Sequence, residues 1–184
     1  MTSSTSQTGN HTTTNTVDDE KFEETHSPDQ YAIQVVNDGR VCEKLRHGAY
    51  GCALGNNSYS SGIHQIKVKI HFGNVFLGIR SRNIVPIPLH PQVPKYDDTP
   101  STYGWWIKSG FRRCNGNSEA SNLPGNAEDN SVFILTINCE EYRLAIVNEK
   151  SKVKDEMEVD RLHAPFPWCL FVELPRTLSC VSLV

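Results

Sequence analysis

The sequence lacks an apolar run near the roughly 20 residues that a membrane-spanning helix needs. Its polar beginning also lacks the apolar segment of a secretory signal peptide. We therefore expect a cytoplasmic protein without membrane contact, with the nucleus as the alternative location. In either compartment the six cysteines stay reduced. They include no Cys-x-x-Cys pair, and we expect neither a metal site nor a cofactor.

A clustered excess of basic residues is lacking too. The formal net charge is −3. Residues 1–30 hold six acidic residues and one basic residue, Lys21, and the remainder holds 17 basic and 15 acidic residues. A phosphate-binding surface normally shows a basic stripe, and neither part has one. Nucleic acid is therefore not an expected partner.

Catalytic sequence motifs are missing as well. The seven histidines form no His-Glu-x-x-His motif, and there is no Gly-x-Ser-x-Gly motif. Glu140 and Glu141 are adjacent carboxylates in a predicted turn, where their side chains diverge. Glycosidases instead need two carboxyl groups that face one cleft at about 5–10 Å. We expect no enzymatic activity.

Residues 1–30 are predicted to form a disordered tail. Residues 1–17 are mainly Ser, Thr, Asn and Gln, and an acidic run extends to about Pro28. Such a segment buries too little apolar surface to offset the conformational entropy lost on ordering. The remaining length suits one domain, which we assign to residues 31–184.

Residues 31–184 show a succession of short strand patterns. Apolar and polar residues alternate within 62–72, as in a strand with one buried face. Three hairpins are predicted, one around Asn-Asp-Gly at 37–39, one around Gly-Asn at 73–74, and one in which 131–138 and 143–149 pair across 139–142. Further strands are predicted at 131–138, 143–149, 165–174 and 177–184. No segment shows sustained helical spacing, so we predict an all-β antiparallel sandwich.

Two long segments interrupt these strands. Prolines within 85–101 remove backbone donors, so this segment cannot lie in a central strand. Residues 114–130 are rich in Gly, Asn and Ser and are predicted to be a second loop. Loops of this length are uncommon in a compact domain and are often functional or mobile.

The serial order of several stretches carries a family resemblance. KVKIHFGNVFLGIRS is followed by Tyr103-Gly104-Trp105, then by SVFILTINCEEYRLAIVNE and APFPWCLFVEL. Over roughly residues 31–184 this order resembles the SPRY domain, a concanavalin-like jelly-roll sandwich related to the B30.2 module of ubiquitin-ligase and adaptor proteins. The resemblance implies recognition of a protein or peptide through loops at one end of the sandwich, without a cofactor. No RING, B-box, coiled-coil or SOCS-box sequence accompanies it, so no ubiquitin-ligase role is implied.

Two adjacent tryptophans must face opposite sides of the strand that holds them. Trp105 shares its side with Tyr103 and Ile107 and is expected in the core. Trp106 shares the other side with Lys108, and two interpretations stay open for it. Either the proline-rich segment or the acidic tail covers it, or it is exposed as a recognition anchor.

The candidate partner-binding residues are Tyr50, Arg80, Ser81, Arg82, Tyr103 and Trp106. The resemblance places the region of Arg80 and Ser81, and the stretch Tyr103–Trp106, near the family's peptide site. The guanidinium groups of Arg80 and Arg82 either bind an acidic or carbonyl-rich peptide or are solvated charges at the rim. Tyr50 either contacts the partner or closes the end of the sandwich.

We thus predict a monomeric interaction module whose partner is a protein or peptide segment. A lectin-like carbohydrate-binding domain is the rival prediction. In the rival, a sugar stacks on Trp106 while acidic and asparagine side chains of 114–130 hold its hydroxyl groups or a calcium ion. Calcium-dependent binding would favour the rival.

Overall fold

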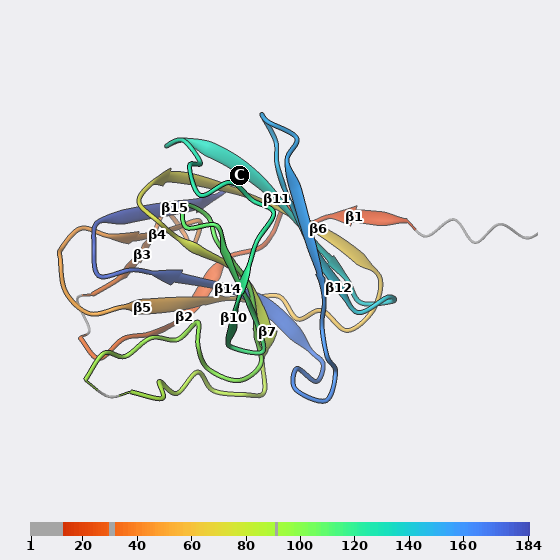
Figure 1. The fold of residues 1–184 in the computed structure, drawn as a ribbon, viewed down its shortest axis with the longest axis horizontal. Helices are drawn as coiled ribbons and strands as arrows, with labels where there is room; N and C mark the ends of the chain where they lie inside the picture. The colour runs from red at the N-terminus through yellow and green to blue at the C-terminus, as the bar shows by residue number, and fades with distance from the viewer. Residues whose placement is uncertain (1–12, 30–31, 91) are drawn as a thin grey trace, which may run out of the picture.

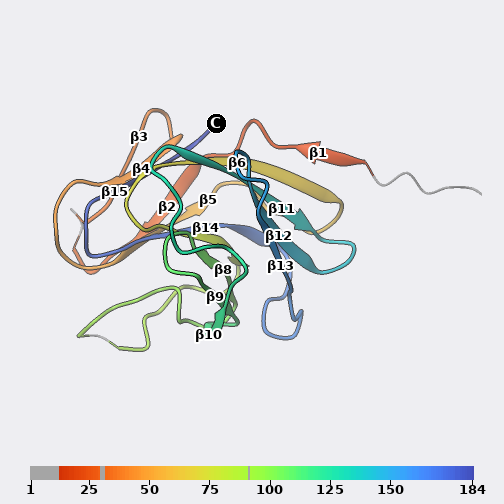
Figure 2. The same ribbon diagram turned by 45° about the horizontal axis from the view of Figure 1, so that its top comes forward.

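The computed structural model describes residues 13–29, 32–90 and 92–184. These residues form two β-sheets packed face to face, and none of them is helical (Figure 1, Figure 2). The all-β sandwich predicted from the sequence is confirmed. Since the described part of the chain is free of helices, it offers no helical segment that could cross a membrane.

The first sheet is built around the long strand β6. Its strand order is β13 (Lys154–Glu158), β12 (Arg143–Asn148), β11 (Ser131–Asn138), β6 (Ile63–Phe72), β15 (Ser179–Leu183), β4 (Val41–Lys44) and β3 (Gln34–Val36). β1 (Thr14–Thr16) pairs in parallel with Ile63 to Gln65 of β6, whereas β15 pairs with β6 from Phe72 to Val68. β1 and β15 therefore share one edge of β6.

The second sheet has only antiparallel neighbours. Its strand order is β10 (Asn117–Ala120), β9 (Phe111–Cys114), β8 (Thr102–Trp106), β7 (Phe76–Ser81), β14 (Trp168–Leu174), β5 (Gly51–Gly55) and β2 (Phe22–His26).

The main core lies between the two sheets. Ile66, Val68 and Ile70 point into it from β6, and each is at most 1% exposed. Leu77 and Ile79 of β7 meet them from the second sheet. The alternating residues of β6 remain partly exposed, because a strand directs successive side chains to opposite faces.

The centre of the second sheet is buried on its outer face as well, so every residue of β7 and β14 is buried. The proline-rich segment runs from the end of β7 back to β8 and contributes Tyr96 to this cover (Figure 1, Figure 2). A smaller apolar cluster results beneath it, formed by Cys52, Leu54, Phe76, Tyr96, Cys169 and Phe171, with Tyr50 and Trp106 partly buried at its margin.

The predicted tail of residues 1–30 needs correction. Residues 1–12, 30 and 31 lie outside the described residues, but β1 and β2 belong to the two sheets. Phe22 is buried in the main core, and the buried carboxylate of Glu20 accepts hydrogen bonds from the Tyr59 hydroxyl and the Asn57 backbone. One apolar side chain and one buried acceptor thus fix a segment whose composition is otherwise that of a disordered chain.

The hairpin predicted at 73–74 is also wrong. β6 belongs to the first sheet and β7 to the second, so the chain crosses between sheets at this point. Gly73 has a φ of 87°, a conformation that glycine adopts readily. Both hairpin turns and crossings between sheets use this conformation, so the glycine does not distinguish them. The alternating pattern predicts that a segment is a strand, but it does not predict which strand pairs with it.

Other turns follow the prediction. Asn37, Asp38 and Gly39 all have positive φ and connect β3 to β4 as a hairpin. β11 and β12 pair as the second confirmed hairpin. The predicted loop 114–130, however, contains β10, which pairs with β9 across the Asn115-Gly116 turn. β13 was not predicted at all.

Candidate partner-binding site

The two adjacent tryptophans of β8 serve opposite faces of the second sheet. Trp105 is fully buried in the main core, where its indole N–H donates to Asp155 Oδ2 at 2.8 Å. Trp106 is half-buried on the outer face, and its indole N–H donates to Asp97 Oδ2 at 2.7 Å. Asp97 belongs to the proline-rich segment, so this segment does cover part of Trp106, as one of the two interpretations expected.

The rest of the Trp106 ring faces a cavity of about 250 Å³, called here the Tyr50–Trp106 cavity. Tyr50 precedes β5 and Trp106 ends β8, so the fold brings together two of the predicted residues from distant parts of the sequence. The cavity is lined by Tyr50, Asn74, Lys95, Trp106, Ser109, Phe111, Arg113, Ser118 and Pro175. Its walls are thus aromatic and polar side chains from loops and strand ends.

The charged side chains of this cavity are both basic. The Lys95 ammonium lies 5.5 Å from the centre of the Tyr50 ring, within the range of a cation–π contact. Arg113 Nε donates to Asp97 Oδ2 at 2.6 Å, the same oxygen that accepts the indole N–H of Trp106. No carboxylate belongs to the described lining residues. An acidic group of a partner would therefore meet Lys95 and Arg113, of which Arg113 is already paired with the buried Asp97, and no exposed anion.

Glu173 fixes the end of the proline-rich segment that passes the cavity. This fully buried carboxylate of β14 accepts hydrogen bonds from the backbone N–H groups of Tyr96 at 3.1 Å and Asp97 at 2.6 Å. Burial, followed by the neighbouring charge of Asp97, raises the pKa of Glu173 well above its usual value. The carboxyl group thus places Asp97, which in turn orients Trp106 and Arg113.

Arg80 fixes the other parts of the same segment. Its buried guanidinium donates to the Ile84 carbonyl from Nε at 3.2 Å and from Nη2 at 2.8 Å. Nη1 donates to Thr99 Oγ1 at 3.1 Å, and the group lies 5.5 Å from the centre of the Phe171 ring. Burial lowers the pKa of Arg80. One cation therefore holds the beginning and the end of the segment together.

Several predicted contact residues are corrected by their burial. Arg80 and Ser81 are 0% exposed and Tyr103 is 2% exposed, so in this conformation none of them presents a surface to a partner. Ser81 donates its backbone N–H to Ser101 Oγ at 2.9 Å. Arg82 is half-buried, and its guanidinium donates to the Gly55 and Asn57 carbonyls. These residues support the loops rather than line the cavity.

Sequence reasoning missed Lys95, Asp97, Phe111, Arg113 and Pro175. Phe111 and Arg113 lie on β9, which was not predicted as a strand. The Asn115-Gly116 dipeptide that turns β9 into β10 was a usable signal, because it favours a tight hairpin turn. Lys95 and Asp97 depend on how the proline-rich segment folds back, which no local pattern reveals.

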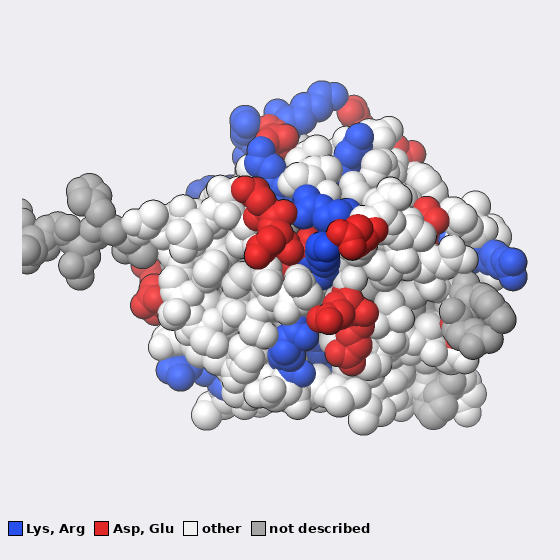
Figure 3. Space-filling model, turned by 180° about the vertical axis from the view of Figure 1, so that it is seen from behind, with Lys and Arg blue, Asp and Glu red and all other residues white. Residues whose placement is uncertain are grey.

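Other parts of the surface offer less. On the face shown in Figure 3, acidic and basic side chains are interspersed in small groups. Arg143 on β12, for example, lies 3.6 Å from Glu156 and 3.5 Å from Glu158 on β13. Within 13–29, 32–90 and 92–184, no three His, Cys, Asp or Glu side chains are placed to hold a metal ion. All six cysteines are free thiols, and Cys114 is the partly exposed one among them.

Comparison with known proteins rests on structure. No protein-family model matches the chain, and no curated protein sequence does. The crystal structure of the TRIM65 PSpry domain matches with a TM-score of 0.71 and 14% identity, over 92% of this chain and 90% of that chain. The SPRY domain of human HERC1 matches with a TM-score of 0.63 and 15% identity, over 83% of this chain and 91% of that one. The chain has the SPRY fold.

A third similar structure, that of stonustoxin, embeds the same fold in a larger protein. It matches with a TM-score of 0.62 and 8% identity, over 84% of this chain but 25% of the toxin chain. Identities this low show a shared fold alone. The SPRY architecture expected from the order of sequence stretches is confirmed.

Proposed function

We propose that this SPRY-fold protein is a non-enzymatic interaction module that binds a protein segment at the Tyr50–Trp106 cavity. The observation that carries the proposal is the combination of aromatic walls with two cations and no carboxylate in the lining. Aromatic residues and arginine are the side chains most often found at binding hot spots. The rigid attachment of the flanking segment by Arg80 and Glu173 limits the entropy lost on binding.

The same lining defines the ligand. An apolar or aromatic side chain fits between Tyr50, Trp106 and Pro175, and an adjacent acidic side chain lies within reach of Lys95 or Arg113. Charge-assisted hydrogen bonds to arginine are stronger than neutral ones. We therefore expect a segment in which Asp or Glu neighbours a large apolar residue.

A carbohydrate ligand remains the second candidate, supported by the half-buried indole of Trp106 as a stacking surface. It is weaker because sugar hydroxyl groups and calcium ions both favour carboxylate oxygens. The described lining provides none.

The test is selection of a random peptide library on the full chain, followed by affinity measurement of an enriched peptide. We expect enriched sequences to pair an acidic with an apolar residue. Trp106→Ala should weaken binding by about 2 kcal/mol, or about thirtyfold, as truncation of a hot-spot residue does. Phe111→Ala should weaken it less.

Phe72→Ala is the matched control for Phe111→Ala. Phe72 is 36% exposed, Phe111 is 53% exposed, and Phe72 lies outside the cavity lining. Equal affinities of wild type and Trp106→Ala would place the binding surface elsewhere. If the library yields no peptide and a glycan binds in a calcium-dependent way, the peptide proposal is wrong and the carbohydrate candidate is favoured.

A further inference from the structure

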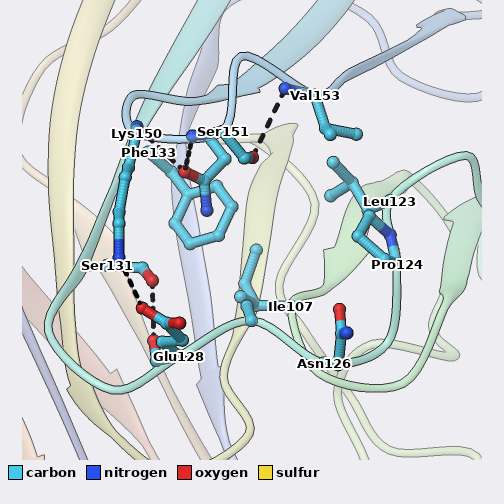
Figure 4. A pocket seen from close by; sticks show the side chains of 12 residues that line it. Ile107, Leu123, Pro124, Asn126, Glu128, Ser131, Phe133, Lys150, Ser151 and Val153 are labelled. Atoms are coloured by element: carbon cyan, nitrogen blue, oxygen red, sulfur yellow. Dashed lines mark hydrogen bonds and ion pairs between the residues drawn. The ribbon is translucent and has the colours of Figure 1, made fainter.

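A second cavity, of about 380 Å³, opens at the same end of the sandwich but between the sheets. Trp106 and Ile107 are consecutive residues that point to opposite sides, so the first lines the Tyr50–Trp106 cavity and the second lines this one. The two cavities share no lining residue. The new cavity, called here the inter-sheet cavity, is lined by Ile107, Leu123, Pro124, Asn126, Ala127, Glu128, Ser131, Phe133, Asn148, Lys150, Ser151 and Val153 (Figure 4).

The floor of the inter-sheet cavity is part of the main core. Ile107 and Phe133 are 1% exposed and Leu123 is 4% exposed, although all three border the open space. Well-packed protein interiors leave few voids larger than a water molecule. A space of several hundred cubic ångströms lies instead in the size range of small-molecule sites, about 300–1,000 Å³.

Two asparagine side chains give the cavity free polar groups. Asn148 Oδ1 accepts the backbone N–H groups of Lys150 and Ser151, both at 3.0 Å, and so closes the turn between β12 and β13. Its Nδ2 group has no acceptor among the described residues. The Asn126 side chain points toward the open space in Figure 4, and no described residue forms a hydrogen bond with it. A ligand can therefore be held by a donor and an acceptor at the polar side of an apolar cavity.

The charges at the cavity neutralise each other. Lys150 Nζ lies 2.8 Å from Glu128 Oε2, and this solvent-exposed pair lies along one side of the cavity (Figure 4). A charged ligand would find no uncompensated partner there and would lose its hydration on entering. An uncharged ligand avoids that cost.

The wall formed by residues 124–127 can adjust to an occupant. Before it, Asp155 accepts hydrogen bonds from Ser121 Oγ at 2.9 Å and from the Asn122 backbone at 3.2 Å. After it, Lys108 forms an ion pair with Asp129. No described hydrogen bond involves residues 124–127, so their displacement breaks none.

We propose that the inter-sheet cavity is a separate binding site for a small, uncharged and mainly apolar molecule that carries one polar group. The apolar part lies against Ile107, Phe133 and Val153. The polar group bonds to the Asn148 and Asn126 amides. This site is independent of the proposed partner-binding site, because the lining residues differ.

The test uses 2-naphthol and 2-naphthoate as probes of the full chain by amide NMR. The two molecules have the same ring system, but the first is uncharged at neutral pH and the second is an anion. We expect 2-naphthol to shift the amide signals around Phe133, Leu123 and Ser151. It should bind at least about tenfold more tightly than 2-naphthoate. Equal affinities, no saturable shift, or shifts centred on Tyr50 and Trp106 would each overturn the proposal.

Two variants locate the site. Asn126→Phe places a ring in the cavity from an exposed position, and we expect it to weaken 2-naphthol binding about tenfold or more. Asn117→Phe on β10 is the matched control, since it makes the same exchange at an exposed position outside the cavity, and it should leave binding unchanged. Asn148→Asp keeps the turn acceptor but removes the amide donor, so it should also weaken binding. Unchanged affinity in both cavity variants would overturn the assignment.

Discussion

Asp155 and Glu173 are buried carboxylates, one in each sheet, and each holds a long loop against the sandwich. Asp155 accepts hydrogen bonds from Trp105 Nε1, Ser121 Oγ and the Asn122 amide and backbone. Glu173 accepts from two backbone N–H groups of the proline-rich segment. Their structural tasks are alike, but their electrostatic surroundings differ.

The pKa values of the two groups move in opposite directions. Burial opposes ionisation of Asp155, but the hydrogen bonds from Trp105, Ser121 and the backbone outweigh it and lower the pKa of that carboxyl. Burial and the charge of Asp97 together raise the pKa of Glu173, and its two backbone donors do not compensate. The number of hydrogen-bond donors and the sign of the neighbouring charge decide whether the pKa of a buried acid is lowered or raised.

The largest effect expected from this comparison is that of Asp155→Ala. It removes the acceptor of a buried indole N–H and of three loop donors, each worth about 1 kcal/mol. We expect the free energy of unfolding to fall by about 4 kcal/mol, measured by urea denaturation. Glu156→Ala, at the exposed neighbouring position of β13, should change it little. A loss as small as that of the control would contradict the anchoring role.

Glu173→Ala should destabilise less than Asp155→Ala, by about 1–2 kcal/mol. It leaves two buried N–H groups unpaired, but it also removes a carboxyl group whose ionisation is unfavourable in that place. Urea denaturation at neutral pH measures the difference. The comparison fails if Glu173→Ala proves more damaging than Asp155→Ala.

The pH dependence of stability should differ in sign between the two sites. The pKa of Asp155 lies below 3.8 in the folded state, so its contribution is present above that pH and is lost as the pH falls through the folded pKa. The pKa of Glu173 lies above 4.5, so its contribution is full below that pH and is lost as the pH rises through the folded pKa.

Urea unfolding of wild type, Asp155→Asn and Glu173→Gln across a pH series tests these signs. The stability difference between wild type and Asp155→Asn should grow as the pH rises from strong acid. The difference between wild type and Glu173→Gln should shrink as the pH rises from 4.5 toward neutrality. If both stability differences change with pH in the same direction, the electrostatic surroundings do not distinguish the two carboxyl groups.

The smallest effect is expected at an exposed ion pair of the first sheet. Lys67 on β6 lies 3.1 Å from Glu149, with 45% and 41% of the side chains exposed. Lys67→Ala should lower the free energy of unfolding by less than about 1 kcal/mol, and added salt should abolish the difference. A larger loss in urea denaturation would show that the outer face of the first sheet is covered as the second one is.

Sequence patterns predicted many of the apolar strands, such as β6, β8 and β14, but not what covers them. Ile66 and Trp105 were correctly assigned to the core, because the period of two places alternate residues on one face. Arg80 also points to the outer face of its strand. The alternating sequence pattern looks the same whether water or a loop covers that face. The cover comes from Ile84 and Thr99, whose approach is set by chain folding beyond any local window.

The candidate site shows the same limit. Tyr50 and Trp106 could be selected as aromatic residues beside glycines and loops, and the structure joins them in one cavity. Lys95 and Arg113 could not be selected, because their relevance depends on β9 and on the return of the proline-rich segment. The inter-sheet cavity had no sequence signal, since its floor residues look like ordinary core residues.

The two-point attachment of the proline-rich segment also makes it suitable for protein engineering. Arg80 and Glu173 hold residues 84 and 96–99, whereas Val85, Ile87 and Leu89 are 59%, 69% and 59% exposed. The stretch between the attachments can therefore be exchanged for a foreign sequence while both fixed ends keep their bonds. Such a graft would be displayed on a closed ring of chain, constrained at its base in the way that a cyclic peptide is.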